Sequence, residues 1–350
     1  MALHAIPELD RNLPKTIAYV IQQLSALSCR VFQPVPGAVC AYFDFGKDKT
    51  LAFRADMDGL PITEETGLSY ASRHPGCMHA CGHDGHTAIL LELARKIHGT
   101  QSFPYNALLM FQPAEETDGG ARDICETGIL EQYGVKAVFG LHVWPGLPEG
   151  QIFSRPGVLM ATACGVNVVF SGKSVHVAQA QQGADALAAC CGFYDRAESI
   201  SENQPHLLKF GRITGGTAPN VVCGQAELSG SLRAWNENTL ERVKNQICSL
   251  CRQVAEEKGC TGQVCFRQGY PAVFNDDDLW KRVCAVAPMG KVIEPFMTTE
   301  DFSFYQKQVP GVLFLLGIGN TAPLHSPQFS LDPNILPFGT DFFLHLLCSL

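Results

Sequence analysis

The chain has 350 residues, of which 46% are hydrophobic and 17% are charged, so it can bury one large core or two medium ones. This composition excludes a largely disordered protein. The formal net charge is −8 and the sequence has no cluster of lysine and arginine, so we expect no nucleic-acid partner.

Residues 1–10 contain neither the basic segment nor the apolar core of a secretory signal. The longest strongly apolar run, residues 312–318, is too short to span a bilayer. We therefore expect a soluble, cytoplasmic protein without a membrane partner.

Up to about residue 155, segments with helical periodicity alternate with β-rich apolar segments. The predicted helices are residues 12–28 and 87–98, and the predicted strands are residues 39–45, 50–54, 106–111 and 137–143. Such alternation is typical of an α/β domain with a parallel or mixed sheet. Polar residues follow several of these strands, and ligands of α/β proteins collect at such strand ends.

The pattern changes from about residue 164. We predict, in order, a strand, a helix, two strands, a helix and a strand at residues 166–170, 185–200, 207–213, 225–234, 237–257 and 262–267. A β-α-β-β-α-β order is typical of the ferredoxin-like fold.

After residue 270 the α/β character returns, with a helix at 277–286, a strand at 311–316 and a helix at 337–350. The sequence therefore predicts an α/β domain in two parts, residues 1–162 and 271–350, interrupted by an α+β lid at residues 163–270.

The fifteen cysteines are scattered, which does not suit a small disulfide scaffold, so we expect most of them to be buried thiols. Cys248 and Cys251 form a C-x-x-C pattern inside the predicted helix 237–257. Both thiols fall on or beside the apolar face of that helix, and we therefore discount a redox role.

Residues 77–86 read C-M-H-A-C-G-H-D-G-H, with two cysteines, three histidines and an aspartate. Three kinds of site compete for this stretch. A structural zinc site needs a second pair of ligands, and no matching pair follows. A cysteine nucleophile needs a histidine base and an orienting group, which closeness in sequence does not establish.

A catalytic metal site needs further acidic and imidazole ligands, and these follow other predicted strands. Glu115 and Glu116 come after the strand 106–111, His142 ends the next strand, and His325 lies in a loop after the strand 311–316. Each has an ordinary explanation alone: a solvated helix start for the glutamates, a buried core residue for a histidine. Their common place at strand ends of one domain favours the metal site.

Eight stretches of this chain resemble a known family of metal-dependent amidohydrolases. The family includes hippurate hydrolase, N-acetyldiaminopimelate deacetylase and the plant auxin-conjugate hydrolases, and is related to aminoacylase and carboxypeptidase G. The stretches, in the expected order, are residues 4–9, 54–61, 78–86, 115–116, 140–142, 217–221, 300–302 and 324–327. The resemblance implies a mixed-sheet, zinc-peptidase-like catalytic domain with an inserted ferredoxin-like lid and dimerisation domain.

The resemblance also implies the roles of individual residues. The implied ligands of two divalent metal ions per subunit are Cys81, His83, Glu116, His142 and His325. Glu115 is the implied general base, while Asp84 and His86 shape the turn and the helix start. Asp56 and Asp84 are candidate hydrogen-bond acceptors for the rings of ligating histidines. Cys77 and His79 are expected to be supporting residues.

In the lid, His176 stands where the family has a histidine that enters the active site of the partner subunit and helps to hold the substrate carbonyl oxygen. This implies a homodimer. Asn220 and Arg233 are candidates for holding the free carboxylate of the substrate, because a guanidinium can bond both carboxylate oxygens. An exposed histidine on a loop and an exposed strand cation are the ordinary alternatives for His176 and Arg233.

The sequence departs from the family pattern at two places. Residues 176–181 read His-Val-Ala-Gln-Ala-Gln, so the second histidine that relatives commonly carry after the lid histidine is missing. Arg54 stands where the more distant carboxypeptidase relatives place a histidine ligand, as expected of the subgroup that uses Cys81.

The expected activity is hydrolysis of N-acyl-L-amino acids, such as N-acetyl or N-benzoyl amides, by metal-activated water. A thiolate with imidazoles and a carboxylate suits zinc, cobalt, nickel or manganese. The alternatives are a metallo-dipeptidase or carboxypeptidase with the same metals, and a catalytically silent metal-binding relative. Glu115 argues against the last, because a silent protein has no need of the base.

Overall fold

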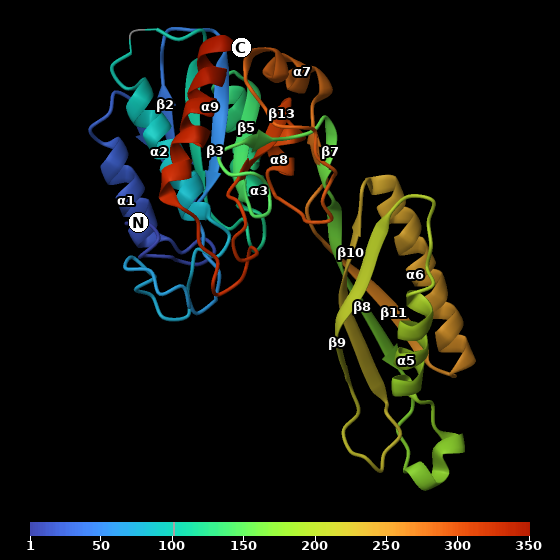
Figure 1. Cartoon of the computed structure of the whole chain (residues 1–350). Coiled ribbons are helices and arrows are strands. Elements are labelled where there is room, and N and C mark those ends of the chain that lie inside the picture. The colour runs from blue at the N-terminus through green and yellow to red at the C-terminus, as the bar shows by residue number, and fades with distance from the viewer. Residues whose placement is uncertain (101) are drawn as a thin grey trace. The chain divides into compact units, whose positions relative to one another are not determined.

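The computed structural model describes residues 1–100 and 102–350, which form two compact units (Figure 1). The first unit contains Met1–Leu159, Val273–Pro295 and Glu300–Leu350. The second unit contains Met160–Ala272 and Phe296–Thr299. The sequence analysis had placed the inserted segment at residues 163–270, without the short piece 296–299.

A seven-stranded sheet forms the centre of the first unit. In spatial order its strands are β1 (Arg30–Phe32), β2 (Val39–Phe43), β4 (Asn106–Gln112), β3 (Thr50–Asp56), β5 (Val135–Trp144), β13 (Gly311–Gly317) and β6 (Ile152–Phe153). The four strands β4, β3, β5 and β13 run parallel, and the strands at both edges are antiparallel to their neighbours. Every residue of β3, β4 and β13 is buried, because helices cover both faces of a parallel sheet.

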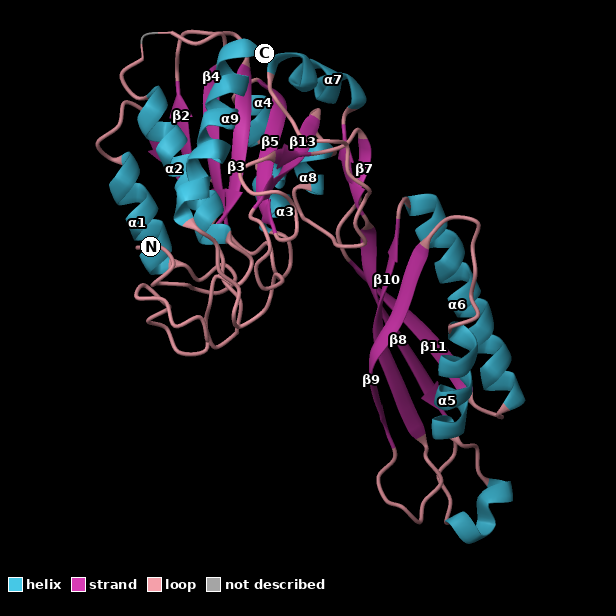
Figure 2. Ribbon diagram, viewed as in Figure 1, coloured by secondary structure: helices cyan, strands magenta, loops and turns pink. Residues whose placement is uncertain are grey.

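The helices of the first unit form layers on the two faces of this sheet (Figure 2). One layer contains α1 (Pro14–Leu24), α2 (His83–Ile97) and α9 (Leu336–Ser349). The other contains the short helices α3 (Gly120–Glu126), α4 (Ile129–Gln132) and α8 (Ser303–Gln306). Phe53, Phe139 and Phe314 point from neighbouring strands into the core shared with α2 and α9. The chain also forms α7 (Asp277–Val286) and a short η2 helix (Pro333–Ile335).

The second unit has the chain order β8 (Thr162–Ser171), α5 (Ala186–Ala197), β9 (His206–Gly215), β10 (Gln225–Ala234), α6 (Glu237–Glu257) and β11 (Thr261–Gln268). Its sheet has the order β11-β8-β10-β9, and all three pairs are antiparallel. Alternate residues of β8 are buried against α5 and α6, so one face of the sheet carries both helices (Figure 2). A 3-10 helix (Val177–Gln182) follows β8. The small sheet of β7 (Gly157–Met160) and β12 (Val273–Asn275) lies where the chain passes between the units.

The predicted fold class, an α/β domain with a mixed sheet and an inserted β-α-β-β-α-β segment, is confirmed. One difference concerns the metal-site prediction directly: α2 begins at His83 rather than at residue 87. The first turn of the helix therefore contains His83 and His86. None of the helices in the described part of the chain combines the length and the apolar character needed to cross a membrane.

Candidate metal centre

The carboxyl ends of β3, β4 and β5, together with the start of α2, carry most of the predicted site residues. Two groups of potential ligand atoms each lie within 4.8 Å of one another, and both contain Cys81. The groups are Cys81, His83 and His142, and Cys81, Glu116 and His325. All five implied ligands thus come together. Cys81 Sγ lies 3.4 Å from His142 Nε2, and His325 Nε2 lies 3.2 Å from Glu116 Oε1.

Gly82 allows Cys81 and His83 to approach this position. Its φ angle is +84°, which favours glycine, and a Cβ atom at this residue would lie 2.4 Å from Val143 Cγ2. The chain then enters α2 directly, so His83 is the first residue of the helix. Glycine is therefore required at position 82 both by the turn and by the close approach to Val143 of β5.

Two of the histidines use Nδ1 within the protein and direct Nε2 towards the ligand groups. His83 Nδ1 donates to the main-chain carbonyl of Asp58 at 2.9 Å, and His142 Nδ1 donates to that of Val143 at 2.6 Å. Since a carbonyl oxygen can only accept, each ring keeps a proton on Nδ1, and Nε2 is the nitrogen that a metal ion could bind. His83 Nε2 is buried and has no hydrogen-bond partner within the described residues. A metal ligand needs this arrangement of the ring.

His86 differs from these two histidines, although it lies in a further group with Asp56 and His83. Its Nδ1 donates to Asp56 Oδ1 at 2.6 Å, and its Nε2 accepts from the main-chain N–H of Val143 at 2.9 Å. Both ring nitrogens are used within the protein, so His86 has no lone pair left for a metal ion.

The two adjacent glutamates follow a turn at the end of β4, and their side chains have partly different neighbours. Ala114 has a φ of +58°, and the carboxylate of Asp58 accepts from the main-chain N–H of Glu115 at 3.2 Å and of Glu116 at 3.1 Å. Glu116 joins Cys81 and His325. Glu115 groups with His83 and Glu116 and, in a second group, with two further carboxylates, Glu300 and Asp301. The geometry therefore allows one glutamate to be a ligand and the other to be a base.

Burial and nearby charges shift the pKa values in this cluster. Burial, with Glu300, Glu116 and Asp301, raises the pKa of Glu115 well above its usual value. Burial and the adjacent carboxylates also raise the pKa of the Cys81 thiol. Burial opposes a charge on His83, but Asp56 and Asp58 outweigh it and raise its pKa to about 10. Without a metal ion the site therefore holds protons that a cation would displace.

Arg54 joins three buried acids in a network beside the glutamates. Its Nη1 lies 2.7 Å from Asp56 Oδ2, and its Nη2 lies 2.7 Å from Asp301 Oδ1 and 3.0 Å from Glu300 Oε1. Its Nε donates to Gln112 Oε1 at 2.8 Å. The guanidinium thus links the ends of β3 and β4 to the turn before α8. Arg54 has no lone pair for a metal ion, because a guanidinium is always protonated in proteins.

The second unit contains the other predicted site residues. His176 and Asn220 are exposed on loops, and His176 Nδ1 accepts from the main-chain N–H of Ala178 at 3.2 Å. Arg233 is half-buried near the far end of β10, where its Nη1 donates to the main-chain carbonyl of Met297 at 2.6 Å. Asn220 precedes β10 and Arg233 is near its last residue, so about 27 Å of strand separates their ends. Their predicted role in holding the substrate carboxylate stays a prediction.

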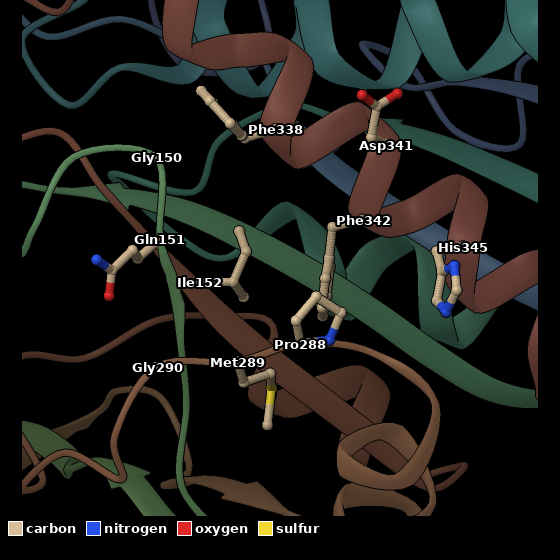
Figure 3. Close-up of a pocket in the computed structure, with 10 residues that line it drawn as sticks. All are labelled: Gly150, Gln151, Ile152, Pro288, Met289, Gly290, Phe338, Asp341, Phe342 and His345. Atoms are coloured by element: carbon tan, nitrogen blue, oxygen red, sulfur yellow. The ribbon is translucent and has the colours of Figure 1, made fainter.

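A separate cavity of about 480 Å³ lies in the first unit, and its lining includes none of the predicted site residues. Figure 3 shows Phe338, Asp341, Phe342 and His345 projecting from α9 beside residues 150–152 and 288–290. The cavity has the size of small-molecule pockets, but none of the clusters of potential metal ligands among the described residues lies in it.

Comparison with known proteins decides the family. The model described as "Peptidase family M20/M25/M40" matches residues 52–349. The chain belongs to this family. It is 36% identical over 340 residues to the N-acetyldiaminopimelate deacetylase of Shouchella clausii, covering 93% of the chain and 90% of that relative. It is 33% identical over 357 residues to the N-acetyldiaminopimelate deacetylase of Exiguobacterium sibiricum, and this match covers 98% of the chain and 96% of that relative.

A solved structure agrees with this assignment. The YXEP protein of Bacillus subtilis is described as a dinuclear metal binding peptidase from the M20 family. The match covers 99% of this chain and 96% of the YXEP chain, with a TM-score of 0.88 and 29% sequence identity. The predicted family, the fold class and the hydrolase class that acts on carbon–nitrogen bonds are thereby confirmed.

Asp56 and Asp84, the candidate acceptors for the rings of ligating histidines, make other contacts in this structure. Asp84 Oδ2 pairs with His4 Nδ1 at 2.9 Å, since the side chain turns towards the N-terminal segment. Asp56 pairs with His86 and Arg54, and its nearest approach to His83 Nε2 is 3.7 Å, too long for a hydrogen bond. The acceptors for the rings of His83 and His142 are main-chain carbonyls instead.

The sequence analysis gave no role to Asp58, Glu300 and Asp301. Asp58 lies two positions beyond Asp56, the last residue of β3. A repeated carboxylate directly after a buried strand was therefore the available signal. The adjacent pair Glu300–Asp301 belonged to one of the stretches that carried the resemblance, but its partner Arg54 is distant in sequence.

Proposed function

We propose that this M20 enzyme hydrolyses the amide bond of N-acyl-L-amino acids, using two divalent metal ions and Glu115 as the general base. The observation that carries the proposal is the pair of ligand groups that share Cys81, beside Glu115, which groups both with His83 and Glu116 and with Glu300 and Asp301. The relatives named N-acetyldiaminopimelate deacetylase favour an N-acetylated amino acid as the substrate class.

The donor set fits two divalent ions. Cys81, His83 and His142 would hold one ion, and Cys81, Glu116 and His325 would hold the other. The buried, unpartnered His83 Nε2 supports this assignment, because a buried polar atom without a partner is costly. Thiolate, imidazole and carboxylate together favour zinc, cobalt, nickel or manganese over magnesium.

The bound metals would lower the pKa of water and polarise the carbonyl of the amide. Glu115 would take a proton from the attacking water on its carboxylate and deliver it to the leaving nitrogen. Burial and the neighbouring carboxylates raise the pKa of Glu115 above its usual value, which favours retention of the proton between the two steps. Asp58 orients this glutamate through the main-chain N–H groups that it accepts.

We further propose that the second unit is a lid and dimerisation domain, and that His176 and Asn220 act on the substrate in the active site of a second copy. Strand β9 supports a homodimer, since it lies at the edge of its sheet and is exposed from Gly211 to Gly215. An unpaired strand edge can add a strand from another chain. Asn220 and Arg233, contributed by different copies, would hold the free carboxylate of the substrate. A cytoplasmic location stays a prediction.

A substrate panel tests the activity. Metal-free protein is supplied in turn with zinc, manganese, cobalt and nickel, and is assayed on N-acetyl-L,L-diaminopimelate, other N-acetyl and N-benzoyl amino acids, and dipeptides. We expect release of the free amino acid from the N-acyl compounds and none after chelation. Unchanged turnover after complete removal of metal would refute the metal mechanism. Preferential cleavage of dipeptides would assign a metallo-dipeptidase or carboxypeptidase activity instead.

A further inference from the structure

Strands β3 and β5 separate just before the metal centre. They pair in parallel as far as Arg54 and Gly140, although β3 continues to Asp56 and β5 continues to Trp144. Beyond this point the facing main-chain groups of the two strands no longer pair with each other. These residues are buried, so the freed groups need other partners.

The first turn of α2 supplies partners on both sides of the gap. His86 Nε2 accepts from the N–H of Val143 in β5 at 2.9 Å, and Thr87 Oγ1 donates to the carbonyl of Asp56 in β3 at 2.8 Å. Both side chains are buried, His86 at 2% and Thr87 at 1% exposure. One helical turn thus fills the gap between the two strand ends.

His86 is itself fixed from β3. Its Nδ1 donates to Asp56 Oδ1 at 2.6 Å, and Asp56 Oδ2 lies 2.7 Å from Arg54 Nη1. A continuous chain of buried hydrogen bonds therefore runs from Arg54 through Asp56 and His86 to the Val143 peptide. The ring of the neighbouring His142 donates to the carbonyl of the same residue, Val143, at 2.6 Å.

We propose that His86 is a positioning residue of the metal centre, which holds the end of β5 so that His142 Nε2 faces Cys81 Sγ. It acts through the Val143 peptide and does not bind metal itself. The inference rests on the proposed function only in taking His142 as a ligand.

Three variants test this role. His86→Gln keeps one acceptor and one donor on the side chain, whereas His86→Leu removes both at similar volume. Thr340→Val is the matched control, because Thr340 Oγ1 also donates to a buried carbonyl, that of Ile89 in α2 at 3.3 Å, away from the strand gap. Affinity for Zn²⁺ is measured by competition with a chelator, the visible spectrum is recorded with Co²⁺, and the metal-free stability of each variant is measured in urea.

We expect His86→Leu to weaken Zn²⁺ binding by about 10- to 100-fold and to alter the ligand-field bands of bound Co²⁺. We expect His86→Gln to restore most of the affinity and Thr340→Val to retain it. If His86→Leu does not fold, His86→Asn replaces it, since the shorter amide cannot reach both partners, and the same loss is expected.

Wild-type affinity in His86→Leu or its replacement would overturn the inference. An equal loss in His86→Gln would assign His86 as a ligand, and an equal loss in Thr340→Val would mean that general destabilisation lowers the affinity. His142→Ala separates this inference from the proposed function: if that variant binds Zn²⁺ as tightly as the wild type, the ligand assignment fails first.

Discussion

The carboxylate of Asp58 offers the sharpest test of how the site is built. The side chain is 1% exposed and accepts from two consecutive main-chain N–H groups, those of Glu115 and Glu116. Asp58→Asn preserves the shape but provides only one acceptor oxygen, and its amide group turns a donor towards the second N–H. Asp58→Ala leaves both donors without their partner.

The magnitude follows from the number of lost acceptors. A hydrogen bond to a charged group contributes about 1.5–3 kcal/mol, and the loss is felt in full when the donor stays buried. We expect Asp58→Asn to lower the free energy of unfolding by about 2–3 kcal/mol and Asp58→Ala to lower it by about 3–5 kcal/mol. Both variants also release the turn that carries Glu115. We therefore expect kcat to fall while the ligands outside this turn, such as Cys81 and His142, remain in place.

Urea unfolding of the metal-free protein measures the stability change, and steady-state kinetics of the metal-loaded protein measure kcat. The matched control is Asp44→Asn, since Asp44 is exposed and, among the described residues, accepts from one main-chain N–H, that of Gly46 at 2.8 Å. This control should change stability by less than about 0.5 kcal/mol. The reasoning is refuted if Asp58→Asn unfolds at the same urea concentration as the wild type, or if Asp44→Asn loses as much stability.

Three further predictions concern the chemistry of the site. Glu115→Gln should lower kcat by about 10²- to 10⁴-fold with unchanged metal content, as measured by steady-state kinetics and metal analysis; wild-type turnover would exclude Glu115 as the base. Metal binding should release protons, because Cys81 has a raised pKa and His83 has a pKa raised to about 10, so the apparent affinity should tighten as the pH rises towards 10. Calorimetry in buffers of different ionisation enthalpy counts these protons, and zero release would contradict the prediction. The protonated His83 also stabilises the metal-free protein: this contribution is complete below the unfolded pKa of about 6.5 and is lost as the pH rises through about 10. If His176 acts in the partner subunit, mixing the separately inactive Glu115→Gln and His176→Ala variants should restore about a quarter of the wild-type activity, since half of the dimers are then mixed and each has one intact site. No recovery after subunit exchange would place His176 in its own subunit or outside catalysis.

The sequence predicted the parallel strands best. Residues 106–111 and 311–316 correspond closely to β4 and β13, because strands buried on both faces are nearly continuous apolar runs. The start of α2 was predicted at residue 87 and lies at His83, since the first turn, His-Asp-Gly-His, has no apolar periodicity. The short helices α3 and α8 were not predicted, because seven and four residues are too few to establish a period.

For the site, residue types and family motifs suggested which side chains gather, but not which partner each one takes. Asp84 pairs with His4, which is 80 positions away in sequence, and His86 accepts from Val143, which is 57 positions away. Such pairs depend on where β3, β5 and α2 meet in space. Their partners therefore became apparent only from the fold.

The buried network around Arg54 makes position 54 difficult to substitute alone. Arg54 compensates three carboxylates, those of Asp56, Glu300 and Asp301, and all four side chains are at most 2% exposed. Replacing the arginine alone by a histidine ligand, as the resemblance to more distant relatives suggests at this position, would leave buried acids without their cation at a cost of about 3–5 kcal/mol. A single Arg54→His substitution should therefore lower the stability of the fold and should not by itself create a new metal ligand.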